Sequence, residues 1–532
     1  MKKLKQLILC GVALWLGVAG IAAAQEAPGP DVELLRKRLS IAQREAALNE
    51  RRLEDFAGEL RSFEEYLEPE QFERLMESVT LRVPAPALPD ELPSDPDALR
   101  ELLAAQETYA QQVRARLLAA RNVDGGLDLE TLRYKRLVDE VARETARVRG
   151  LELKHPIDSV ILTREELKEL LSRLLAKELT DALVRGESLT WQALGILPPD
   201  ADLKLLYSGL LEEQVGGLFD DATGALYVVD TFDPKSFLGR VILAHEINHA
   251  LQDQHFPIKD LPFRTANSDQ NTAVAAVLEG DATMLMIEWG MQNFKPADML
   301  GLTEVMNQGT EQLADVPPAL VQALVFPYMG GMYFMTALQA SGTEGWRDLP
   351  FRDPPQSTEQ ILHPEKYYAE REAPIEVDLP EWEARDGLEE VHRGVVGEWV
   401  TRLILTPPES FPMLTALTTE VLVNEPVAVA AAAGWGGDRF VAVASADDSR
   451  WFVAWKTVWD DALDADEFEH AFARRVAQWP GFAESDYRQW GNETDGRAAW
   501  IDRDGRDTWV VVASNGELLA TAREWLGRDN EG

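Results

Sequence analysis

Two histidines and a glutamate in one short stretch have the residue types and spacing of a hydrolytic metal site. The stretch reads His245-Glu246-Ile247-Asn248-His249, a His-Glu-x-x-His pattern. Residues four apart share one face of an α-helix, so His245 and His249 can present two imidazoles to one Zn²⁺. Glu246 lies beside them, where a carboxylate can accept a proton from water. The pattern therefore predicts a zinc site with its own general base.

The neighbouring residues predict the elements that position this pattern. Residues 226–230, Leu-Tyr-Val-Val-Asp, are mostly apolar with two β-branched valines and predict a strand. Asp233 and Pro234 predict the start of a helix, as an N-cap followed by proline at the first helical position. Pro257 would end the helix. Apolar residues would bury the rest of it: Val241, Leu243, Ala244, Ile247, Ala250 and Leu251.

A catalytic zinc site needs a third protein ligand, and the next predicted helix, residues 268–289, carries two candidate glutamates. Glu279 and Glu288 are nine residues apart, which at 100° per residue puts them on opposite faces. Asp281 also points away from the face of Glu279. Small residues around Glu279 would let its helix approach the histidine helix closely: Ala275, Ala276, Gly280 and Ala282. We therefore predict His245, His249 and Glu279 as the ligands.

Three pieces of this region resemble a known type of protein. They are the His-Glu-x-x-His pattern, Ala-Leu-Gln-Asp-Gln-His-Phe at 250–256, and Glu-Gly-Asp-Ala at 279–282. Together they resemble a group of uncharacterised bacterial exported proteins of the zincin, gluzincin-like metallopeptidase type. Two later pieces, residues 357–366 and 434–439, resemble the same group, and the similarity covers about residues 196–440. The resemblance implies a zincin-like core that hydrolyses peptide bonds.

One position departs from that resemblance. Thermolysin-like gluzincins carry an aspartate four residues after the ligand glutamate, hydrogen-bonded to a ligand histidine. This chain has Thr283 at that position. The group that orients the histidine ring is therefore left open.

The segment 351–382 holds the candidates for stabilising the oxyanion of the reaction. A zincin needs a hydrogen-bond donor opposite its base, usually a histidine or a tyrosine. The segment is rich in proline and has no clear periodicity. His363 is the first candidate, and Tyr367 and Tyr368 are the alternatives.

The composition restricts the partners and the location of the chain. A formal net charge of −39 argues against nucleic acid and anionic lipid as partners, because both need a basic surface. Residues 1–24 have the charged start, apolar core and small-residue end of a secretory signal, with cleavage expected before Gln25. Cleavage would remove Cys10, the one cysteine, so no disulfide is expected. Because no later segment reads as a bilayer span, we expect no stable membrane anchor in an exported, periplasmic or extracellular protein.

The amino-terminal part of the mature chain predicts a helical, coiled-coil-like domain, residues 25–150. One long helix over 31–68 repeats apolar residues in steps of three and four. Asn49 falls on this stripe, where a polar residue can fix the register of packing. Helices over 96–121 and 127–150 follow a proline-rich linker. The stripe could join two copies of the chain, so self-association is a possible partner role.

Residues 151–420 are predicted to form the zincin-like domain around the site. Helices are expected over 163–185, 200–214, 300–313 and 317–341, the last with a kink or close packing point at Gly330-Gly331. Two short strands over 216–230 would offer an edge to an extended substrate.

Residues 421–532 predict a small α+β domain. Two hairpins, 440–457 and 497–513, each precede a helix, 466–478 and 516–526.

These observations predict a mostly helical α+β protein with a zincin-like core. Its function would be that of an exported zinc metallopeptidase acting on a protein or peptide, with Glu246 as the base. One alternative is an exported scaffold or binding protein whose zinc site is structural or vestigial. Another is a zinc amidase acting on the cell wall. An intact Glu246 favours an enzyme, because a structural site needs no base.

Overall fold

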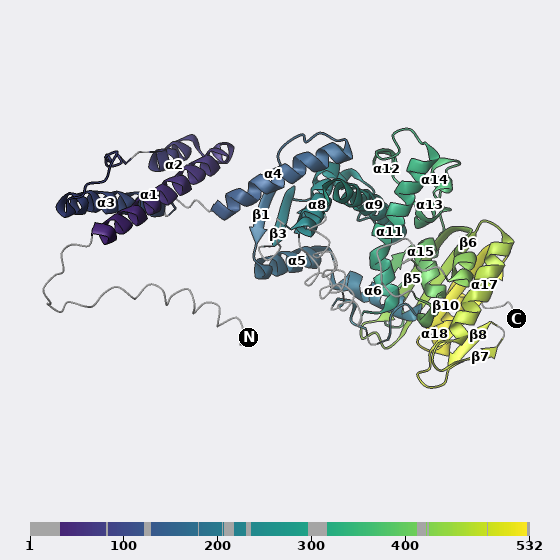
Figure 1. Ribbon diagram of the computed structural model, residues 1–532. Coiled ribbons are helices and arrows are strands. Elements are labelled where there is room, and N and C mark those ends of the chain that lie inside the picture. Colours follow the sequence, from purple (N-terminus) through teal and green to yellow (C-terminus); the bar gives the residue numbers. More distant parts are fainter. Residues whose placement is uncertain are drawn as a thin grey trace. The chain divides into compact units, whose positions relative to one another are not determined.

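The computed structural model describes residues 32–80, 83–121, 129–178, 180–199, 201–204, 206, 217–229, 236–295, 316–411, 422, 425–486 and 488–528. The expected signal, residues 1–24, lies outside these ranges, as does most of the helix expected at 200–214 and all of that at 300–313. The protein has an α+β fold, with helices along most of the chain and a large sheet near the carboxyl terminus (Figure 1). It divides into two compact units, Met1–Leu132 and Arg133–Gly532, whereas the sequence suggested boundaries at residues 150 and 420.

The first unit is built on α1 (Val32–Arg61), which packs against α2 (Pro69–Thr80) and α3 (Pro96–Arg121). The expected helix over 31–68 ends earlier, in a short 3₁₀ turn at Glu64–Tyr66. Pro69 then starts α2, because proline fits the first turn of a helix. Most of the apolar stripe is buried inside the unit: Leu39, Ala42, Ala46, Asn49, Leu53, Phe56, Leu60 and Phe63. The stripe is therefore covered by the chain's own helices.

The second unit begins with α4 (Leu129–Arg149), β1 (Asp158–Leu162), α5 (Arg164–Glu178) and α6 (Asp181–Ala193). The single helix expected over 163–185 is two helices. Thr180 caps the second one, because its hydroxyl accepts a hydrogen bond from the Leu183 amide at 3.2 Å.

A small sheet lies beside these helices, with the strand order β1-β3-β2. The expected hairpin at 216–230 is confirmed as β2 (Gly217–Asp220) and β3 (Ala225–Val229), paired antiparallel. β1 was not expected, and it pairs parallel with β3. Among the described residues, β2 therefore has a neighbouring strand on one side only.

Two capped helices follow the small sheet. α8 (Phe237–His255) starts after Ser236, whose hydroxyl accepts from the Gly239 amide, and it ends before Pro257 as expected. α9 (Ser268–Asn293) starts after Asn267. Both helices are largely buried, and α8 packs on α9 and on β2.

The tightest helix contact joins α9 to α11 (Pro318–Ser341). A Cβ on Gly280 would lie 2.3 Å from the backbone of Gly331, and a Cβ on Gly331 would lie 1.9 Å from the Ala276 carbonyl oxygen. Ala276 and Gly280 therefore admit α11, a packing partner that the sequence did not indicate. Gly331 is a close packing point, as expected.

α11 is also apolar. By length and composition alone it could cross a membrane, which the sequence analysis did not anticipate, and 56% of its most apolar stretch is buried inside the protein. Its buried residues pack against α9, the short helices α12 (Leu349–Arg352) and α13 (Thr358–Leu362), and α15 (Gly397–Leu405). It thus packs as a core helix of the second unit.

The carboxyl-terminal sheet has seven strands in the order β4-β5-β6-β10-β9-β8-β7. The two expected hairpins are confirmed as β5 (Trp435–Ser445) with β6 (Trp451–Trp459), and β9 (Ala498–Asp504) with β10 (Asp507–Ala513). The remaining strands were not expected: β4 (Leu388–Gly394), β7 (Phe482–Asp486) and β8 (Gln489–Asn492). Because β4 precedes residue 421, the sheet extends across the suggested domain boundary.

Helices cover both faces of this sheet. α17 (Ala462–Ala477) packs on the side chains of Ala442, Trp455 and Val510, whereas α18 (Gly516–Trp525) packs on those of Val443 and Val511. Successive strand residues alternate between the two cores, as the two-residue period of a strand requires. The short helices α14 (Glu365–Tyr368) and α16 (Pro426–Ala432) complete the unit.

Candidate metal centre

The structure brings together the three ligands expected from the sequence. His245 Nε2 lies 3.2 Å from His249 Nε2, and Glu279 Oε2 lies 3.1 Å from the first and 3.5 Å from the second. The histidines lie one turn apart on α8, and Glu279 reaches them from α9. Glu288 points elsewhere and pairs with Arg347 at 2.8 Å, so the helix phase inferred from the sequence agrees with the structure.

The donor set fits a zinc ion. A tetrahedron with metal–ligand bonds of about 2.05 Å has edges of about 3.3 Å. The three observed edges are 3.1, 3.2 and 3.5 Å. Two imidazole nitrogens and one carboxylate oxygen are ligands that Zn²⁺ prefers, and three protein ligands leave a fourth position open.

Glu246 lies next to the three expected ligands but makes its hydrogen bond to β2. Its Oε2 accepts a hydrogen bond from the Phe219 amide of β2 at 3.0 Å. Burial raises the pKa of Glu246, and the two histidines oppose this rise only in part. A raised pKa suits a group that must take up a proton and later release it near neutral pH. The contact with Phe219 also fixes the carboxylate beside the edge of β2.

Strong electrostatic coupling links the three expected ligands. Burial alone would lower the pKa of His249, but the Glu279 carboxylate outweighs burial and raises that pKa to about 9. Burial would likewise raise the pKa of Glu279, but His249 and His245 outweigh it and hold that pKa well below its usual range. The charges of the three side chains therefore depend strongly on one another.

A buried hydrogen-bond chain orients His249. Its Nδ1 lies 2.9 Å from Gln252 Oε1, and Gln252 Nε2 donates to Asp281 Oδ2 at 2.9 Å. Asp281 also accepts from Arg149 Nε and Arg347 Nε. Burial would raise the pKa of Asp281, but the two arginines outweigh burial and lower it to about 2. Asp281 points away from the metal ligands, as expected. It anchors Gln252, which in turn contacts the ligand His249.

His245 has no equivalent anchor. Its Nδ1 is buried and lacks a hydrogen-bond partner among the described residues, and the same is true of Thr283 Oγ1. Thr283 is the position where thermolysin-like gluzincins have an aspartate. The two ligand histidines thus differ at Nδ1, which contacts Gln252 in His249 and has no partner among the described residues in His245.

Tyr328 of α11 is a site residue that the sequence reasoning missed. Its ring stacks on the His245 imidazole, with centroids 6.2 Å apart and planes at 21°. The Glu279 carboxylate, burial and the Glu246 carboxylate together raise the pKa of Tyr328 well above its usual value. The phenol is therefore a neutral hydrogen-bond donor at pH 7, and 40% of the residue remains exposed. The only signal for it was the neighbouring Gly330-Gly331, which predicted a close contact of its helix.

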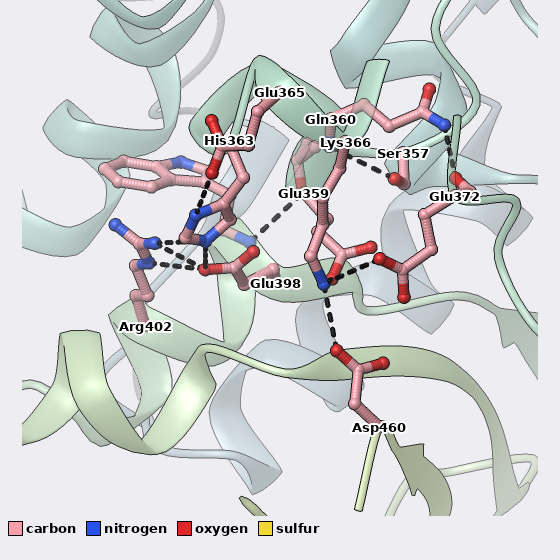
Figure 2. A network of polar contacts seen from close by, with 12 residues as sticks. Ser357, Glu359, Gln360, His363, Glu365, Lys366, Glu372, Glu398, Arg402 and Asp460 are labelled. Carbon is pink, nitrogen blue, oxygen red and sulfur yellow. Dashed lines mark hydrogen bonds and ion pairs between the residues drawn. The ribbon is translucent and has the colours of Figure 1, made fainter. Parts of the chain in front are cut away.

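The structure does not bring His363 to this cluster. His363 ends α13, and its Nε2 lies 3.0 Å from Glu398 Oε1 and 3.3 Å from an Arg402 nitrogen (Figure 2). The Tyr367 hydroxyl donates to the Asp353 carbonyl at 2.8 Å, and Tyr368 is exposed on α14. Among the described aromatic and histidine side chains, Tyr328 is the better-placed donor.

A second group of three carboxylates already surrounds a lysine. Glu359, Glu372 and Asp460 lie close enough to share one cation. Lys366 Nζ lies among them, at 2.7 Å from Glu359, 3.1 Å from Glu372 and 2.9 Å from Asp460 (Figure 2). These contacts tie α13 and α14 to the end of β6. The group is an ion-pair network, and we do not assign a metal to it.

Comparison with known proteins identifies only the sheet region. Residues 386–523 match a family model described as a domain of unknown function (DUF8575). No curated protein and no solved structure matches the chain. The matched segment begins just before β4 and ends within α18, so it covers the seven-stranded sheet and leaves out α8, α9 and α11.

Proposed function

We propose that this protein is an exported zinc-dependent peptidase whose site is formed by α8, α9 and α11. The observation that carries the proposal is the convergence of His245, His249 and Glu279 at the spacing of a zinc tetrahedron. Glu246 lies half-buried beside these three residues and is not one of the proposed ligands, which supports a catalytic role over a purely structural one.

Each residue has a separate task in the proposed reaction. His245, His249 and Glu279 would hold Zn²⁺, which supplies a Lewis acid for the carbonyl and lowers the pKa of water. Glu246 would take a proton from the attacking water and deliver it to the leaving amine. Tyr328 would donate a hydrogen bond to the oxygen that gains negative charge.

The position of β2 favours a peptide over other amides. β2 is an edge strand, and its Phe219 amide contacts Glu246. An extended peptide can add to such an edge through main-chain hydrogen bonds, which would align its scissile bond beside the base. Export rests on the pattern of residues 1–24 alone.

A scaffold with a structural or vestigial site is the second candidate. The surroundings of His245 favour it, because its buried Nδ1 has no hydrogen-bond partner among the described residues to orient the ring toward a metal. In that case the centre would be a buried polar contact between helices.

Digestion of casein by purified protein, with and without a chelator and with zinc added back, tests the proposal. We expect hydrolysis that the chelator abolishes and zinc restores. A parallel digest of peptidoglycan separates a peptidase from a cell-wall amidase. Zinc binding without hydrolysis of either polymer would favour the scaffold.

A further inference from the structure

A separate cavity of about 280 Å³ lies in the second unit. The amino-terminal turns of α9, helices α6, α11 and α15, and strands β4 and β5 all contribute to its walls. Asp269, in its wall, lies ten residues before Glu279 on α9, which is about 15 Å along the helix axis. None of the three proposed zinc ligands lines it. The cavity is therefore distinct from the metal centre.

The cavity joins the matched domain to the rest of the unit. His392, Trp399 and Phe440 come from residues 386–523, whereas Glu187 and Asp269 come from helices that precede that segment. α6 lies directly on β4, because a Cβ on Gly186 would be only 2.5 Å from His392 Cβ. This contact fixes the wall that carries Glu187 next to the wall that carries His392.

Glu187 is the unusual group in this cavity. Its side chain lines the cavity and has no hydrogen-bond or ion-pair partner among the described residues. Burial raises the pKa of Glu187 to about 7. By contrast, the Asp269 carboxylate accepts hydrogen bonds from the Thr358 amide and hydroxyl. A half-buried carboxylate without a protein partner can still accept charged hydrogen bonds, so Glu187 is a position that a ligand can stabilise.

The other walls suit a cation. None of the described residues that line the cavity is a lysine or an arginine. Burial lowers the pKa of His392, so its imidazole is neutral at pH 7 and brings no positive charge to Glu187. Trp191, Trp399 and Phe440 supply aromatic surface, which attracts cations and packs against alkyl groups.

We propose that this cavity binds a small organic cation, a primary ammonium or guanidinium, with its head on Glu187 and its alkyl stem against the aromatic walls. The volume suits a molecule the size of an amino-acid side chain. The proposal is independent of the metal centre and of any peptidase activity.

Titration of the intact protein with n-butylammonium, in the presence of a chelator, tests the proposal. Calorimetry or ligand-observed NMR would measure binding, with n-butanol as the neutral control and butyrate as the anionic control. We expect saturable binding of n-butylammonium and weaker binding of both controls. Glu187→Gln should weaken n-butylammonium binding by about tenfold or more, because it removes a charged hydrogen bond. The matched control is Glu484→Gln, on the exposed part of β7, which should bind as the wild type does.

Ala323→Phe, which would fill the cavity from α11, provides a second variant. It should abolish n-butylammonium binding while circular dichroism shows a folded protein. Equal binding of n-butanol and n-butylammonium would contradict the proposal, as would unchanged binding in Glu187→Gln. Absence of n-butylammonium binding to the wild type at millimolar concentration would overturn it outright.

Discussion

Replacing Asp281 by asparagine should destabilise the second unit more than any other single amide substitution near the site. The Asp281 side chain is 0% exposed. Its Oδ2 accepts from Arg149 Nε at 2.9 Å, Asn248 Nδ2 at 3.0 Å and Gln252 Nε2 at 2.9 Å, and its Oδ1 accepts from Arg347 Nε at 2.7 Å. Asp281→Asn keeps the shape of the side chain but removes the charge that two buried guanidinium groups require.

Two arguments set the size of this effect. Removing one partner of a buried ion pair costs about 3–5 kcal/mol, because the other charge stays buried. The lowered pKa of Asp281, from 3.8 to about 2, gives a smaller figure of roughly 2–3 kcal/mol at neutral pH. Arg149 is only 2% exposed but keeps Asp348 as a partner at 3.0 Å in Asp281→Asn, so the lower end of the larger figure applies. We therefore expect a loss of about 3 kcal/mol or more in the free energy of unfolding at pH 7.

The pH dependence follows from the direction of the shift. A carboxyl group whose pKa is lowered on folding stabilises the protein above its unfolded pKa and loses that contribution as the pH falls through its folded pKa. The difference between wild type and Asp281→Asn should therefore be full at pH 7. It should shrink as the pH falls from about 4 toward 2.

Urea unfolding followed by circular dichroism measures the effect, with Glu288→Gln as the matched control. Glu288 pairs with the same Arg347 at 2.8 Å, but its side chain is 32% exposed. A partly exposed pair contributes about 1 kcal/mol at most, so this control should unfold close to the wild type. Asp281→Asn should also weaken zinc binding about 10-fold, because Gln252 loses the charged one of the two acceptors, Asp281 and the Leu278 carbonyl, that orient it toward His249. Equal stability of the two variants would refute the role of Asp281 as the buried anchor.

Three further predictions concern the ligands, the hydrogen-bond donor and export. Glu279→Ala should lose zinc, whereas Glu288→Ala should keep a zinc content near that of the wild type. Metal analysis of both variants measures this, and loss of zinc from Glu288→Ala would show that the ligand set is wrong. Tyr328→Phe should lower kcat by about 10²-fold or more with little change in zinc content, while Tyr333→Phe, exposed on the same helix, should leave kcat unchanged. Equal kcat in both tyrosine variants would exclude Tyr328 as the donor. Amino-terminal sequencing of exported protein should begin at Gln25, and a chain that starts at Met1 would contradict signal cleavage.

Local patterns predicted the parts of the site that depend on one or two helices. The spacing of His245 and His249 fixes their common face, and the nine residues between Glu279 and Glu288 fix their opposite directions. These relations follow from the helix period and need no tertiary information. The structure retains all of them.

Tyr328 could not be predicted in this way. It reaches His245 only because α11 crosses α9 where Gly280 and Gly331 remove side-chain bulk. The sequence indicated a packing point at Gly331 but not the partner helix. The partners of Asp281 could not be predicted from local patterns either, because Arg149 lies 132 residues away along the chain.

In the seven-stranded sheet too, the hairpins that are local in sequence could be predicted and the strand with a distant partner could not. The hairpins of β5 with β6 and β9 with β10 were predicted, since each pair is largely apolar and local in sequence. β4 reads Leu-Glu-Glu-Val-His-Arg-Gly and is mostly polar, because it is an edge strand with a bulge between Glu390 and His392. Its strand character comes from pairing with β5 and not from its own propensity.

The most direct test of the central claim separates metal binding from proton transfer in one preparation. Glu246→Gln keeps size and hydrogen-bonding capacity but cannot accept the proton, and general-base catalysis is worth about 10²–10⁴-fold in rate. We predict that Glu246→Gln is folded, binds zinc as the wild type does, and hydrolyses casein at least about 10²-fold more slowly. His245→Ala should lose both zinc and hydrolysis. Wild-type hydrolysis by purified Glu246→Gln would contradict the proposed mechanism.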